Sequence, residues 1–103
     1  MPSFNPPKRA EAFEIDVALE DMANPGSFKA NPTIAAGDFK IAKDGGALAN
    51  LATLPAVGPA GSIWVRIALS ATEMTADVVS VQCIDQTAAK EWADRGFSIP
   101  TTA

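Results

Sequence analysis

Two apolar-patterned segments between Ser62 and Ile84 constrain the fold more than any other part of this chain. In the segment up to Ser70, Ile, Val, Ile and Leu alternate with Trp, Arg, Ala and Ser, which is the two-residue period of a β-strand. From Val79 onward Val, Val and Cys alternate in the same way, and the β-branched content favours a strand. We expect two adjacent strands. Because such a hairpin is only marginally stable alone, a sheet made from the rest of the chain must cover its apolar side.

Other short strands are indicated by alternating apolar residues bounded by Gly, Pro, Asn and Asp. We predict a half-buried strand at Phe13–Leu19, a hairpin within Gly37–Asn50 that turns at Lys43–Gly46, an edge strand around Leu54 and Val57, and a last strand at Gly96–Pro100. Six or seven such strands in 103 residues predict an all-β fold, an immunoglobulin-like β-sandwich of one domain. We place this domain at residues 13–103 and an extended arm at residues 1–12.

Local signals also assign roles to four side chains. Ser70 and Glu73 have the Ser-x-x-Glu spacing of a capping box, which predicts a single helical turn between the two central strands. Met74 should then enter the core beneath it. The single cysteine, Cys83, continues the apolar alternation of its strand, so we expect a buried thiol with a packing role.

The N-terminal arm is rich in proline and locally basic. Pro2, Pro6 and Pro7 favour an extended path over a hydrogen-bonded ladder. One interpretation is a frayed terminus. The other is a docking arm that orders on a neighbouring subunit, with Phe4 as an anchor and with Lys8 and Arg9 suited to acidic surfaces.

The two tryptophans are the other candidates for contact residues. Trp64 lies opposite the aliphatic row of its strand, beside Arg66, and either belongs to a binding face or is core. Trp92 is the one large apolar residue in a polar stretch. It either plugs one end of the sandwich or is an exposed contact residue, since aromatic side chains are enriched at interfaces.

Composition excludes several classes of function. A net charge of −4 gives no general attraction for nucleic acid or an anionic membrane. The chain has no His, no Tyr and one Cys, so Ser-His-Asp and Cys-His catalysis and the usual zinc ligand sets cannot be built within it. We therefore expect neither enzymatic activity nor a cofactor. Since no signal peptide or membrane span is visible, we expect synthesis and assembly in a cytoplasm.

Several separated motifs resemble a group of small domains in tailed-bacteriophage structural proteins. The similarity covers about Phe13 to Ala103 and includes GDFKIAKDGGA, a Trp-containing strand, LSATEM and a terminal IPTT. The matching residues are Gly37, Asp38, Lys43, Asp44, Gly45, Gly46, Ala47, Trp64, Leu69, Ser70, Ala71, Glu73, Met74, Ile99, Thr101 and Thr102. Most of these residues are of turn and core types, so they identify the domain better than its task.

The resemblance implies a virion component with an immunoglobulin-like sandwich. A chain that consists of one such domain and an arm is expected to be a capsid decoration (cement) protein, present in many copies, that bridges neighbouring subunits of the major capsid protein. Alternatives are a tail-tip, baseplate or neck protein that binds other tail proteins, or a module that binds a host glycan. The expected partner-binding residues are Phe4, Pro6, Pro7, Lys8, Arg9, Trp64, Arg66 and Trp92.

Overall fold

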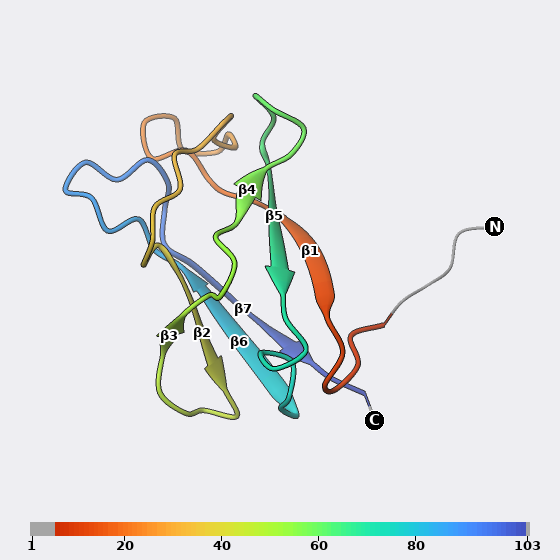
Figure 1. Ribbon diagram of the computed structural model, residues 1–103. Coiled ribbons are helices and arrows are strands. Elements are labelled where there is room, and N and C mark those ends of the chain that lie inside the picture. The colour runs from red at the N-terminus through yellow and green to blue at the C-terminus, as the bar shows by residue number, and fades with distance from the viewer. Residues whose placement is uncertain (1–5, 103) are drawn as a thin grey trace.

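A computed structural model describes residues 6–102, and these residues form seven strands and no helix. Figure 1 shows two layers, a sheet of β1, β5 and β4 and a sheet of β3, β2, β6 and β7. The strands are β1 (Phe13–Ala18), β2 (Phe39–Lys43), β3 (Ala49–Asn50), β4 (Ala56–Val57), β5 (Trp64–Leu69), β6 (Val78–Cys83) and β7 (Arg95–Pro100). Every pairing between these strands is antiparallel. The predicted all-β fold is confirmed.

One hydrophobic core lies between the two sheets. It is made by the inward rows of the strands together with Leu19, Met74 and Trp92. In β5 the buried row is Val65, Ile67 and Leu69, and in β6 it is Val79, Val81 and Cys83. These are the rows that the sequence pattern predicts to face inward. The alternation therefore identifies correctly which side of each strand is apolar and buried.

The expectation that the two central strands pair with each other is wrong. β5 pairs with β1 and β4, whereas β6 pairs with β2 and β7. The connection from Ser70 to Asp77 carries the chain from one sheet to the other. Alternation shows which side of a strand is buried, but an amphipathic strand satisfies the same pattern whether its sequence neighbour lies beside it or across the core.

The connection between β5 and β6 is closed by the predicted capping box. The Ser70 amide donates to Glu73 Oε1 at 2.9 Å, and the Glu73 amide donates to Ser70 Oγ at 3.1 Å. The Met74 amide reaches the Ser70 carbonyl at 3.0 Å, which makes one helical turn, and the Met74 side chain is buried as predicted. Glu73 Oε2 also accepts the Ala52 amide at 2.9 Å, so this carboxylate ties the connection to the segment after β3.

The β2–β3 hairpin is confirmed, with a tight turn at Lys43–Gly46. The Gly46 amide donates to the Lys43 carbonyl at 2.9 Å. The central residues Asp44 and Gly45 have positive φ values of 51° and 76°, whereas Gly46 does not have a positive φ. The Asp44 carboxylate also accepts the Val78 amide at 2.9 Å, which fixes the turn against the start of β6.

At the other end of the sheets two buried carboxylates hold the loops. Asp38 accepts the Ala35 and Gln86 amides at 2.9 and 3.0 Å. Asp85 accepts the Thr87 amide at 3.0 Å, the Thr87 hydroxyl at 2.8 Å and the Glu91 amide at 2.8 Å. The segment that follows β6 is thereby wrapped around Asp85, and this wrapping brings the chain back to the core at Trp92.

Trp92 is a core residue, so its proposed role as an exposed contact residue is wrong. Its side chain is fully buried, and Nε1 donates to the Cys83 carbonyl at 3.1 Å. The ring is tilted against Phe39 with 6.1 Å between centroids. The alternative interpretation, a plug at one end of the two sheets, is correct.

The arm predicted at residues 1–12 needs correction for residues 7–10, which are bonded to the domain. The Thr102 amide donates to the Pro7 carbonyl and the Arg9 amide donates to the Thr102 carbonyl, both at 2.9 Å. Proline removes only its own N–H group, so the Pro7 carbonyl can still join a ladder beside the end of the chain. Pro2 and Phe4 lie outside the described residues.

Candidate functional site

The outward side of the three-stranded sheet carries the most distinctive exposed side chains. We call it the β5 face and define it as Glu14, Asp16, Ala56, Trp64, Arg66 and Ala68. Strand register places Arg66 between Asp16 of β1 and Ala56 of β4, and places Ala68 opposite Glu14. The Trp64 side chain is 45% exposed at one end of this face. A large aromatic ring therefore lies in the open beside a row of charged residues.

An ion pair forms the centre of the β5 face. Arg66 Nε donates to Asp16 Oδ1 at 2.9 Å and Nη2 donates to Oδ2 at 3.0 Å, which is a two-bond fork. The hydrogen bond from Arg66 lowers the pKa of Asp16 below its usual range, and this effect outweighs the opposing effect of burial. The bond to Asp16, together with the charges of Asp16 and Glu14, raises the pKa of Arg66. Both groups are therefore ionised at neutral pH.

Two shallow hollows meet on this face at Ala68, whose side chain is small. One has a volume of about 490 Å³ and is lined by Leu54, Ala56, Pro59 and Arg66 among others. The second has a volume of about 690 Å³ and lies against the N-terminal segment. Its lining includes Pro6, Lys8, Phe13, Glu14 and Ala68. The β5 face therefore continues from Trp64 as far as the start of the described chain.

The structure brings four of the eight predicted contact residues to this surface. Trp64 and Arg66 lie on the sheet, and Pro6 and Lys8 border the adjoining hollow. Pro7 and Arg9 bond to the chain end through their backbones, and Arg9 Nε lies 3.7 Å from Asp77 Oδ1.

Four members of the β5 face were not predicted from the sequence, namely Glu14, Asp16, Ala56 and Ala68. Alternation marks Asp16 and Ala68 as outward residues. However, only the β1–β5 register shows that Asp16 faces Arg66.

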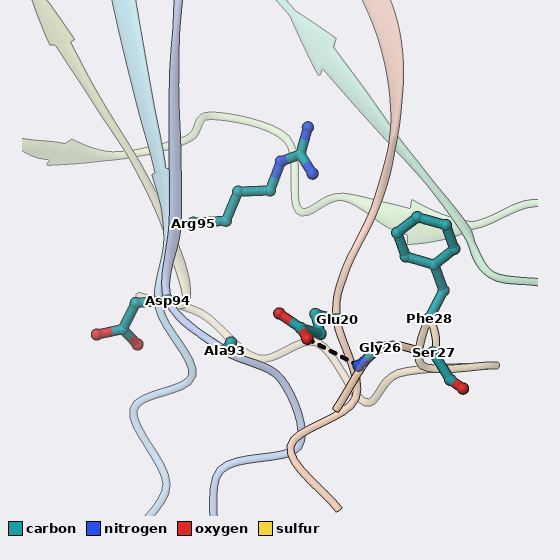
Figure 2. A pocket seen from close by; sticks show the side chains of 7 residues that line it. All are labelled: Glu20, Gly26, Ser27, Phe28, Ala93, Asp94 and Arg95. Carbon is teal, nitrogen blue, oxygen red and sulfur yellow. Dashed lines mark hydrogen bonds between the residues drawn. The ribbon is translucent and has the colours of Figure 1, made fainter. Parts of the chain in front are cut away.

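A further hollow, of about 340 Å³, lies where the loop after β1 meets the start of β7 (Figure 2). Figure 2 shows the Phe28 ring and the Arg95 side chain approaching it from different segments. Glu20 Oε2 accepts the Gly26 amide at 2.9 Å, and Arg95 Nη1 donates to the Ala18 carbonyl at 3.1 Å. Asp94 pairs with Lys90 at 2.6 Å. The charged groups of this hollow are thus engaged with the protein itself. We favour the β5 face because it combines an exposed tryptophan with a neighbouring arginine, two residue types enriched at the energetic centres of protein interfaces.

The described residues offer neither a metal site nor a reactive thiol. Within residues 6–102 no three His, Cys, Asp or Glu residues are grouped so that they could hold a metal ion. Cys83 is buried, and desolvation raises the pKa of its thiol to about 12, only partly offset by the positive charge of Arg95. The thiol is therefore protonated at neutral pH and is a poor nucleophile. None of the described segments is a helix with the length and hydropathy needed to cross a membrane.

The raised pKa of Cys83 predicts a loss of stability in alkali. In the unfolded chain the thiol ionises near its ordinary value of 9.0, whereas in the folded chain it stays protonated up to about 12. The stabilisation is therefore complete below pH 9 and is lost as pH rises, by about 1.4 kcal/mol per pH unit. Urea unfolding between pH 8 and 11 should show the free energies of wild type and Cys83→Val diverging above pH 9. Parallel pH profiles for the two proteins would contradict this assignment.

The fold and the surface together define an all-β domain of two antiparallel sheets with an open, partly aromatic face. Comparisons with known protein families, with curated proteins and with solved structures find no match for this chain.

Proposed function

We propose that this chain is an immunoglobulin-like structural protein of a tailed-bacteriophage particle, and that it serves as a cement protein on the outside of the shell. The proposal combines the sequence resemblance with the roles of the matching residues. Asp38, Asp44, Ser70 and Glu73 are hydrogen-bond acceptors that hold loops and turns. These motif residues specify the domain, so the residues that bind a partner should lie elsewhere on its surface.

The observation that carries the proposal is the β5 face. Tryptophan and arginine are the residue types most enriched among the energetic centres of protein interfaces, and here they are neighbours on one flat sheet. The fork between Arg66 and Asp16 holds the guanidinium in place before binding, which lowers the ordering cost. The hollows on either side of Ala68 leave room for side chains of a partner. The surface suits a broad protein contact better than the enclosure of a small substrate, and we propose no catalytic activity.

In the proposed role the β5 face rests on the major capsid protein and the N-terminal segment lies at one end of that contact. Lys8 and Glu14 line the same hollow. The Lys8 side chain could there contact acidic side chains of a partner. Assembly takes place in the host cytoplasm, and the protein acts in the virion.

The copy number of the protein in separated heads and tails of purified particles tests this function. Quantitative mass spectrometry against the major capsid protein should give comparable copies confined to heads. A few copies confined to tails would replace the cement role by a tail-tip, baseplate or neck role. Absence from particles would reject the structural role altogether.

Replacing Trp64 by alanine should weaken binding to shells that lack the protein. An aromatic side chain that becomes buried in a protein contact can contribute about 2 kcal/mol, so we expect the Kd to rise by about 30-fold. Leu48→Ala is the matched control, because Leu48 is 52% exposed but belongs to the β2–β3 connection. Binding measured by sedimentation with purified shells should be unchanged in that variant. Equal losses in both variants would remove the β5 face from the contact.

Tryptophan fluorescence distinguishes glycan binding from binding to the capsid shell. Trp64 is the exposed indole and Trp92 is the buried one. A change of emission on adding host-surface glycans, lost in Trp64→Phe, would favour a host-recognition module over a shell contact. In the proposed function the emission stays constant with glycan and changes with shells.

A further inference from the structure

The N-terminal segment, Pro7–Ala10, is bound to the domain by a small set of contacts. The Arg9 amide and the Pro7 carbonyl exchange hydrogen bonds with Thr102, and the Ala10 amide donates to the Met74 carbonyl at 3.1 Å. Lys8 and Thr102 are partners in a parallel bridge. Figure 1 shows this first described stretch beside the end of the chain that follows β7. The segment is thus a short stretch held beside the C-terminal end of the domain by one β-bridge and three backbone hydrogen bonds.

A strained turn separates this segment from β1. Ala10 has φ of 64°, a left-handed conformation that is costly for a residue with a Cβ atom. The turn is closed by one long hydrogen bond, from the Glu11 amide to the Lys8 carbonyl at 3.3 Å. Only Glu11 and Ala12 lie between the segment and the first residue of β1, and both are exposed. The connection is short, strained and weakly held, which are properties of a hinge.

We propose that this segment exchanges between copies of the protein, so that Pro7–Ala10 of one copy occupies the strip beside Thr102 and Met74 of a second copy. A second copy of the chain fits the strip because its N-terminal segment is identical. A second copy carries the same residues and can make the same hydrogen bonds, the same bridge and the same Arg9–Asp77 ion pair. Only the turn changes, and an extended hinge removes the positive φ of Ala10.

Geometry and concentration set the conditions for exchange. The chain from Ala10 to the first residue of β1 spans about 10 Å when extended, so the N-terminal ends of the two copies must be adjacent. Association costs translational and rotational freedom, and this cost falls when copies are held at high local concentration. The strip is therefore a docking surface for a second copy of this chain. The inference does not depend on the proposed virion function.

Cysteine pairing tests the exchange directly. One protein carries Lys8→Cys and the other carries Thr102→Cys, since bridge partners lie within the distance that a disulfide spans. The two proteins are unfolded, mixed, refolded together at millimolar concentration and oxidised. Cys83 is buried and stays out of the reaction. The control mixture pairs Lys8→Cys with Ala89→Cys, an exposed position in the loop after β6.

We expect the heterodisulfide of the first mixture, measured on a non-reducing gel, to exceed that of the control by about ten-fold, consistent with an effective concentration far above that of free collision. Yields equal to the control would overturn the exchange.

A glycine variant tests the hinge. Ala10→Gly removes the strain of the closed turn, so the heterodisulfide should fall by about five-fold. Ala12→Gly is the matched control, because Ala12 does not have a positive φ. Equal yields from the two glycine variants would overturn the assignment of Ala10 as the hinge.

Discussion

Trp92→Ala is expected to lower the free energy of unfolding by about 3–5 kcal/mol, the usual cost of removing a large buried aromatic side chain. Trp92 is fully buried against Phe39, and its ring nitrogen donates to the Cys83 carbonyl. The substitution leaves a cavity and removes that donor. Since domains of this size have about 5–15 kcal/mol of stability in total, the variant should be close to unfolding at 37 °C. Urea titration followed by circular dichroism measures the change.

Two further variants make this test specific. Trp92→Phe keeps most of the apolar volume but loses the hydrogen bond, so we expect an intermediate loss. Trp64→Ala removes the same type of side chain from an exposed position and should cost about 1 kcal/mol or less. If the two alanine variants were equally stable, Trp92 would not be a core residue.

The second large effect is expected for Asp85→Ala, with a loss of about 3 kcal/mol. The buried Asp85 carboxylate accepts the amides of Thr87 and Glu91 and the hydroxyl of Thr87. Without it the two amides lose their acceptor in a partly buried position, and a donor left unsatisfied costs about 1–3 kcal/mol. The loop that delivers Trp92 to the core depends on the same carboxylate, so this effect and that of Trp92→Ala should not be additive. Thermal unfolding of the two single variants and the double variant measures the coupling.

The Asp85 carboxylate also makes the stability of the folded protein decrease in acid. Burial raises the pKa of Asp85, but the hydrogen bonds from Glu91 and Thr87 and the charge of Lys90 outweigh burial and hold the pKa below its ordinary value of 3.8. A depressed folded pKa means that the stabilisation is complete above about pH 4 and is lost as pH falls. Asp85→Asn cannot ionise, so its stability should depend less on pH between 5 and 2. A slope as steep as that of wild type would show that other carboxylates cause the decrease of stability in acid.

The carboxylates that hold the loops and the proposed contact residue Trp64 differ in their surroundings. Asp38, Asp44, Glu73 and Asp85 each accept backbone amides from segments that are distant in the sequence or from their own loop. Their substitution should unfold or loosen the domain. Trp64 is exposed, so its substitution can change binding while leaving the fold intact. Binding and stability measurements on the same variants therefore distinguish the proposed interface from the framework that supports it.

Much of the fold was predictable because it depends on local physics. Side-chain alternation gave the buried rows of β1, β5 and β6, and the Lys43–Gly46 turn and the Ser70–Glu73 capping box involve residues only three positions apart. Such features require only φ/ψ preferences and hydrogen bonds between near neighbours. Their signals lie within a few consecutive residues, so they can be predicted from the sequence by itself.

Tertiary structure alone decided which segments meet. Alternation could not show that β5 and β6 belong to different sheets, because a buried row has the same pattern beside its neighbour or across the core from it. Composition could not show that Trp92 is buried while Trp64 is exposed. The burial of Trp92 depends on the loop that Asp85 holds by accepting the Glu91 amide. The candidate surface depends on the same long-range pairing. Asp16 and Arg66 are distant in the sequence, and they become one ion pair only when β1 lies against β5.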